Sequence, residues 1–345
     1  MLPSLAAMTT DLRLRGLTTA DIPAWNRLLA DVEREDRTGE HYNEDDLAEE
    51  MANPDIDPAR DVVGGFLGED LVAYFYVFPR SVADGLHRII IDGTVHPAHR
   101  GRGFGTRMVE AMLARALEAH QERQPDHELQ LTLRGLATND AQASLVAGIG
   151  LSPERWNFVM RADLDDVPEP PSVPAGLELR TYDDGLSRAM HEAHNAAFVD
   201  HPHFTPWTET MWKQWVTESR NFRPGMSLVV LDPAIEGHVA AYLQTNEYDA
   251  YEAMTGKREA YVAKVGTRRE YRGRGLASCL LGHALARYRQ DGYAEAALDV
   301  DSENPTGALG IYQRAGFEVE SRWTDYTRTV PASPTRSTAG TTPVP

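Results

Sequence analysis

The sequence is poor in the residues that build disulfides, metal clusters and membrane spans. Its 345 residues contain one cysteine, Cys279, which excludes an internal disulfide and a cysteine-based zinc cluster. Residues 1–10 carry no basic stretch followed by an apolar run, so we expect no signal peptide. No segment approaches the roughly 18 apolar residues that cross a bilayer. These absences favour a protein of the reducing cytoplasm.

Basic residues are also scarce. Lys and Arg number 34 against 52 Asp and Glu, which gives a formal net charge of −18. Such a balance disfavours a nucleic-acid partner, because phosphate backbones need a basic surface. It is compatible with an amine substrate, although it also serves simply to keep a protein in solution. His191, His194, His201 and His203 have no matching carboxylate motif, so we expect no metal site.

The chain divides into two similar parts joined by a proline-rich segment. Residues 165–176 (DDVPEPPSVPAG) show no apolar periodicity and read as a linker between domains 11–164 and 177–330. Residues 331–345 are rich in Pro, Ser and Thr and are expected to be disordered. Two domains in one chain leave the oligomeric state open, and a monomer would suffice.

The two domains repeat one order of elements at a spacing of about 170 residues. Short strands are expected at 11–15 and 177–180, and apolar strands at 89–91 and 261–265. Each apolar strand leads into a glycine-rich loop and a helix, and further strands are expected at 129–133 and 296–300. This order predicts an α/β fold made of two tandem domains, each a mixed sheet flanked by helices.

The glycine-rich loops read RGRGFG at 100–105 and RGRGLA at 272–277. Each offers backbone N–H groups at a helix N-terminus with little side-chain bulk, an arrangement that binds anions such as pyrophosphate. Neither loop fits the P-loop or the G-x-G-x-x-G dinucleotide motif, because Thr106 and Ser278 stand where the last glycine is required.

Both loops match the pattern Arg/Gln-x-x-Gly-x-Gly/Ala, and in this the chain resembles the GNAT superfamily of acetyltransferases, in particular its tandem-domain members. The resemblance implies that the loops bind the pyrophosphate of acetyl-CoA, used as a co-substrate. It also implies that the splayed strand before each loop binds the pantetheine arm and stabilises the thioester oxyanion. The implied coenzyme residues are Val265, Gly266, Thr267, Arg272, Gly273, Arg274, Gly275, Leu276 and Ala277, with Thr94, Val95, Arg100, Gly101, Arg102, Gly103, Phe104 and Gly105 in the first domain.

The closing segment of the second domain, residues 304–317, resembles the family segment that contains the general acid. The resemblance assigns this role to Tyr312, near the coenzyme sulfur, while Asn304 would cap a helix and touch the coenzyme arm. In the first domain the corresponding position is Val146, which cannot donate a proton. We therefore expect catalysis in the second domain, with a first domain that either binds coenzyme without turnover or is structural. A first domain that is catalytic through another acid remains an alternative.

The leading candidate for the general base is Glu259, at the start of the strand before the second loop. Strand alternation puts Glu259, Tyr261, Ala263 and Val265 on one face. Asp299, Asp301 and a chain of waters remain alternatives. The first-domain counterpart of Glu259 is His87, a residue type that titrates near neutrality.

Together these patterns predict an acetyl-CoA-dependent N-acetyltransferase acting on a primary amine of a small molecule. The acceptor and the length of the acyl chain stay open. Two other hypotheses are a non-catalytic acyl-CoA sensor and an aminoacyl transferase of the tandem type. Phe204, Trp207, Trp212 and Trp215 serve either an acceptor pocket or core packing, and Cys279 is expected to be a buried core residue.

Overall fold

The computed structural model describes residues 12–200, 204–302 and 308–332. Asn304, His201 and His203 lie outside the described residues, as does nearly all of the predicted tail. Within the described part, residues 164–177 contain no helix or strand, as expected of the segment between the two halves. None of the helices in these ranges is long and apolar enough to span a membrane.

The first half alternates strands and helices in the expected order. Its strands are β1 (Arg13–Gly16), β2 (Val62–Leu67), β3 (Asp70–Ala83), β4 (Leu86–Val95), β5 (Glu128–Leu136) and β6 (Ser152–Asp163). Its helices are α2 (Ile22–Asp36), α3 (Glu44–Met51), α4 (Pro58–Asp61), α5 (Phe104–Arg123) and α6 (Asp140–Gly148).

The second half repeats this order. Its strands are β7 (Glu178–Thr181), β8 (Leu228–Leu231), β9 (Val239–Asn246), β10 (Glu259–Thr267), β11 (Glu295–Asp301) and β12 (Glu318–Val330). Its helices are α7 (Ser187–Phe198), α8 (Glu209–Trp212), α9 (Asp249–Thr255), α10 (Leu276–Gln290) and α11 (Ala308–Arg314). A single π-turn, Lys213–Thr217, continues α8.

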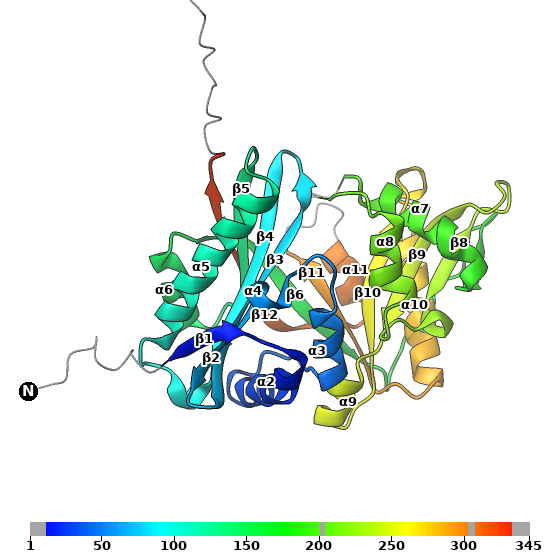
Figure 1. Ribbon diagram of the computed structural model, residues 1–345. Helices are drawn as coiled ribbons and strands as arrows, with labels where there is room; N and C mark the ends of the chain where they lie inside the picture. Colours follow the sequence, from blue (N-terminus) through cyan, green and yellow to red (C-terminus); the bar gives the residue numbers. More distant parts are fainter. Residues whose placement is uncertain (1–11, 201–203, 303–307, 333–345) are drawn as a thin grey trace, which may run out of the picture.

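All these strands form one continuous sheet rather than two. Its order is β1-β2-β3-β4-β5-β12-β6-β11-β10-β9-β8-β7. The pairs β4–β5 and β10–β11 are parallel, and the other neighbours are antiparallel. The fold is therefore the predicted mixed α/β arrangement, with a sheet that runs through both halves (Figure 1).

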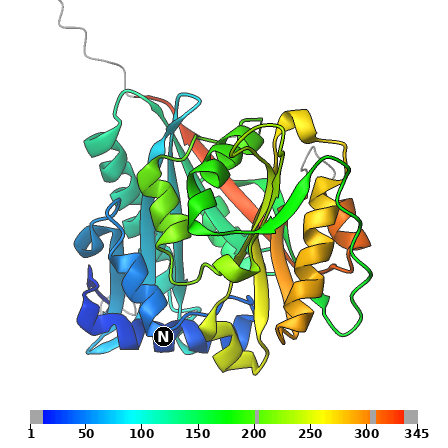
Figure 2. The same cartoon turned by 90° about the vertical axis from the view of Figure 1, so that its right-hand side faces the viewer.

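The last strands of the two halves are exchanged. Strand β12 comes from the second half but pairs with β5 of the first, from Trp323↔Leu136 to Val330↔Leu129. Strand β6 comes from the first half but pairs with β11 of the second. Figure 2 shows β12, in red, crossing between the first half and the second.

Helices cover both faces of each half. In the second half, α10 buries one face of the sheet with Leu280 and Leu281, and α7 with the α8 region buries the other with Met190 and Trp212. In the first half, α5 and α2 do the same through Met112 and Trp25. Cys279 is 1% exposed in the α10 core, so its prediction as a buried residue is confirmed.

The strand exchange predicts that neither half folds alone. We expect residues 1–170 or 171–345, expressed separately, to lack a cooperative thermal transition, because each loses the strand that closes its sheet and exposes a long unpaired edge. Co-expression of the two pieces should restore a complex with one transition. A cooperative transition of the isolated 1–170 piece would contradict this expectation.

Candidate functional site

Both glycine-rich loops take the geometry of an anion site. Gly273 and Gly275 have φ of +75° and +79°, and Gly101 and Gly103 have +72° and +81°, values that residues with side chains rarely adopt. Helices α10 and α5 begin directly after Gly275 and Gly103, without a side-chain cap. A Cβ built on Gly101, Gly273 or Gly275 meets no atom within 4 Å. The space in front of each helix N-terminus is thus left for an anion.

The first arginine of each loop anchors the loop to its own half. Arg272 donates to Asp200 at 2.8 Å, and through Nε and Nη2 to the carbonyls of Thr267 and Ala197. Arg100 makes two hydrogen bonds of 2.6 Å with Asp36. These guanidinium groups therefore hold the loop against the helix on the opposite face of the sheet, a function that the sequence pattern did not reveal.

Strands β10 and β11 separate just before the second loop. They pair only over Glu259–Tyr261 and diverge beyond Tyr261. Strands β4 and β5 likewise pair only over Leu86–Ile90. Val265, Gly266 and Thr267 therefore have β9 on one side and the opening on the other. The divergence creates an opening along strand edges whose backbone groups on that side have no strand partner.

The second half contains a β-bulge that the first half lacks. Ala263 has no partner on β9, because the register shifts between Val262 and Lys264. In the first half, β4 pairs regularly with β3 from Ile89 to Val95. Because of the bulge, the prediction that Tyr261 and Val265 share one face of the strand is wrong. Beyond Ala263, Lys264 lies on the same face as Tyr261, whereas Val265 packs against the α10 core on the other face. Nothing in the sequence indicates the extra residue.

Tyr312 lies on α11, with its ring edge-on to Phe317 at 6.1 Å. Burial raises the pKa of Tyr312 to about 12, so its hydroxyl is protonated at neutral pH. Its counterpart Val146 is 1% exposed and packs in the first-half core. The side chains at these equivalent positions thus differ as the sequence indicated.

The three carboxylates considered as general bases are each paired with an arginine of the first half. Glu259 accepts a hydrogen bond from Arg161 of β6, and Asp299 accepts one from Arg134 of β5. Asp301 accepts from Arg155 at 2.8 Å. The strand exchange brings these arginines beside β10 and β11. Each candidate base therefore has a carboxylate oxygen already engaged by an arginine.

Glu259 sits in a buried charge cluster where β10 and β11 still pair. Its carboxylate is 6% exposed, and Arg161 also contacts Glu295 at 3.2 Å and Glu320 at 2.9 Å. Lys257 and Tyr251 add hydrogen bonds to Glu295. Burial works to raise the pKa of Glu295, but these partners outweigh it and leave the pKa lowered.

Replacing Arg161 by methionine should therefore destabilise the protein strongly. Two nearly buried carboxylates would lose their shared cation, which typically costs about 3–5 kcal/mol. Urea unfolding measures this loss. Arg188→Met is the control, because its ion pair with Glu192 is largely exposed and should contribute less than about 1 kcal/mol. A loss below about 1 kcal/mol for Arg161→Met would show that the cluster is dispensable.

The histidines occupy packed positions. His87 is buried against His120, with 2.9 Å between their Nδ1 atoms, and burial lowers the pKa of His87 to about 4. The expectation that it titrates near neutrality is wrong for this reason. His194 is 1% exposed and bonds Tyr242 at 2.6 Å. Within the described ranges, no three His, Cys, Asp or Glu side chains are grouped to hold a metal ion.

Two of the aromatic residues whose role the sequence left open are core residues. Trp212 is 3% exposed and Trp207 packs beside it, so both belong to the core on the α7 face. Trp215 is 41% exposed.

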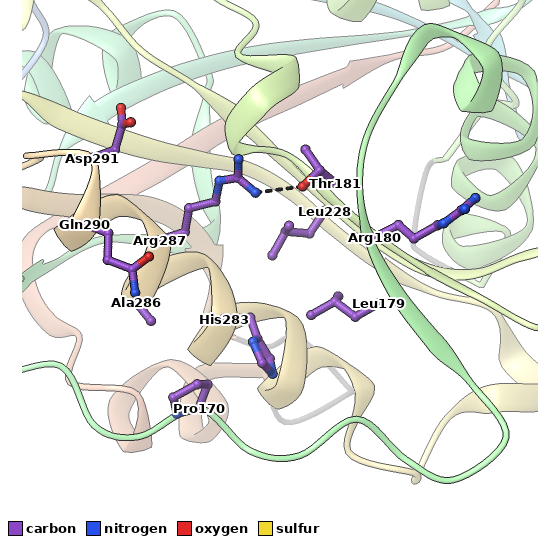
Figure 3. Close-up of a pocket in the computed structure, with 10 residues that line it drawn as sticks. All are labelled: Pro170, Leu179, Arg180, Thr181, Leu228, His283, Ala286, Arg287, Gln290 and Asp291. Atoms are coloured by element: carbon purple, nitrogen blue, oxygen red, sulfur yellow. Dashed lines mark hydrogen bonds between the residues drawn. The ribbon is translucent and has the colours of Figure 1, made fainter.

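A hollow of about 480 Å³ lies away from the predicted site, between α10 and β7, where Arg287 donates a hydrogen bond to Thr181 (Figure 3). No predicted site residue lines it.

Comparison with known proteins agrees with this geometry. The model of the acetyltransferase (GNAT) family matches residues 24–125 and 187–317. A mycothiol acetyltransferase of Thermobispora bispora is 31% identical over 74% of this chain and 79% of its own length. One of Saccharomonospora viridis is 29% identical over 77% and 86%.

Solved structures show the same arrangement. A GCN5-related N-acetyltransferase from Sphaerobacter thermophilus is 27% identical, with a TM-score of 0.75 over 93% of this chain and 96% of its own. A tandem GNAT protein from the clavulanic acid biosynthesis pathway, 20% identical, has the same fold with a TM-score of 0.64 over 94% and 99%. One family model matches two stretches of the chain, and the Thermobispora bispora relative is 31% identical over 74% of it. The chain therefore belongs to the GNAT acetyltransferase family.

Proposed function

We propose that this protein transfers an acetyl group from acetyl-CoA to a primary amine of a small molecule, with the chemistry in the second half. The proposal rests on three features that follow one another from β10 to α10. These are the divergence of β10 from β11, the bulge at Ala263, and the N-terminus of α10, which has no side-chain cap. In this proposal the loop 272–277 binds the pyrophosphate, and the open edge of Val265–Thr267 binds the pantetheine arm.

The reaction is a direct attack on the thioester. The neutral amine nitrogen forms a bond to the acetyl carbon, the carbon–sulfur bond breaks, and the amine gives up a proton. Tyr312 donates a proton to the departing thiolate. Backbone N–H groups at the bulge lie at the divergence of the strands, where they would stabilise the oxyanion. Glu259 is our first candidate for the base, with Asp299, Asp301 and water as alternatives.

We propose that the first half does not turn over. Its loop has the same glycine geometry, but β4 has no bulge and Val146 offers no proton. Its opening contains a cavity of about 80 Å³, whose charged lining residues are Glu33, Asp36, Glu40, Asp92 and Arg134. This is smaller than the roughly 300 Å³ at which ligand pockets usually begin.

The test is thiol release from acetyl-CoA with a panel of amines, followed by mass spectrometry of the products. The panel includes precursors of mycothiol type, because the relatives are named mycothiol acetyltransferases. Amine-dependent thiol release with an N-acetylated product supports the proposal. Tight coenzyme binding without release for any amine would favour a sensor, and a gel shift with aminoacyl-tRNA would favour an aminoacyl transferase.

A further inference from the structure

Lys264 lies on the face of β10 that points away from α10. The opposite face of the strand is covered by α10, which packs on Ala260 and Val262. Lys264 is paired with Gln244, and Gly266 with Tyr242, and directly opposed residues share one face of a sheet. Tyr242 bonds His194 of α7, so this face is the α7 side. In the proposed reaction the amine approaches the thioester at the bulge from this side.

The side-chain nitrogen of Lys264 is not in direct contact with a carboxylate of the described residues. Among the described residues it makes no hydrogen bond or ion pair, although the chain as a whole carries an excess of carboxylates. Asp299 acts on it electrostatically from β11, but that carboxylate is bound by Arg134. Arg80 of the first half adds a second positive charge.

Burial lowers the pKa of Lys264, with Asp299 opposing the effect and Arg80 adding to it. Burial therefore works against the ammonium form of this partly buried side chain, which has no direct partner among the described residues. A second buried group beside it is also unsatisfied. Gln244 is 3% exposed, and its Oε1 has no hydrogen-bond partner within the described structure. Uncompensated groups of this kind are costly unless a ligand pairs with them.

The fold itself does not require a cation here. The equivalent position in the first half, opposite Tyr76 on β3, is Asp92. Its carboxylate accepts a hydrogen bond of 2.9 Å from Tyr74. The same strand position thus carries opposite charges in the two halves, and only the positive one lacks an internal partner.

We propose that Lys264 binds a carboxylate of the acceptor, so that the acceptor is an amine that also carries a carboxylate, as amino acids and short peptides do. This inference rests on the proposed acetyl transfer in the second half. A charge-assisted hydrogen bond from the ammonium group would fix the carboxylate and direct the amine toward the acetyl carbon at the bulge.

The test compares acceptors that differ only in the carboxylate: a set of amino acids against the matching amino-acid amides. Thiol release is measured for the wild type, Lys264→Gln and the conservative Lys264→Arg. We expect the wild type to prefer the acids at least about tenfold in kcat/KM. Lys264→Gln should lose that preference through a higher KM for the acids alone, and Lys264→Arg should retain most of it.

Each other outcome has a distinct meaning. Equal wild-type rates with acids and amides overturn the carboxylate assignment while leaving acetyl transfer intact. Lys264→Gln could instead lower kcat/KM equally for acids and amides while the acetyl-CoA affinity, measured by calorimetry, stays unchanged. That result would place Lys264 at the thioester and would also overturn the carboxylate assignment. Absence of transfer to every amine would remove the proposed function, and the inference with it.

Discussion

Replacing Gly275 by valine is expected to raise the dissociation constant of acetyl-CoA at least about tenfold, or about 1.4 kcal/mol, and to abolish turnover. The substitution places a β-branched side chain at φ +79°, in the space before the α10 N-terminus where no protein atom lies within 4 Å. It therefore both strains the loop and fills the anion site. Calorimetry and steady-state kinetics measure the two effects.

Two matched variants separate these causes. Gly292 has φ +84° and equally open surroundings, but it lies beyond the other end of α10, so Gly292→Val should reproduce the strain without weakening coenzyme binding. Gly103→Val alters the first loop and should leave turnover within about threefold. We expect one coenzyme per chain. A dead Gly103 variant beside an active Gly275 variant would mean that catalysis belongs to the first half.

Tyr312→Phe is expected to lower the turnover number by roughly 10²-fold or more, the usual range for a lost general acid. The ring and its contact with Phe317 remain, so the fold and the acetyl-CoA affinity should stay unchanged. The measurement is kcat with an identified amine acceptor. Tyr326→Phe, which removes a hydroxyl in the first-half core, is the control and should be silent. A loss of less than about threefold for Tyr312→Phe would reduce this tyrosine to a packing residue.

Local features of the sequence determined the repeated order of elements and the two loops. A positive φ at Gly101, Gly103, Gly273 and Gly275 follows from residue type and short spacing, so the motif predicts the geometry directly. The contrast between Tyr312 and Val146 could likewise be read from two aligned segments. The resemblance to a known family added the coenzyme, which spacing alone does not identify.

Contacts between distant residues were decided only by the tertiary structure. The exchange of β6 and β12 joins residues more than a hundred positions apart, and neither strand's own alternation says which edge it will meet. The pairing of Glu259 with Arg161, and of Asp299 with Arg134, follows from that exchange. The candidate bases therefore have environments that no pattern within the second half predicts.

The bulge at Ala263 shows the same limit at the scale of one residue. A strand pattern fixes the face of each side chain only while the register stays regular, and one extra residue reverses it. The sequence by itself thus determined that β10 leads into a glycine-rich loop and a helix. Only its pairing with β9 decided that Lys264, rather than Val265, faces the α7 side, because register is set by the partner strand.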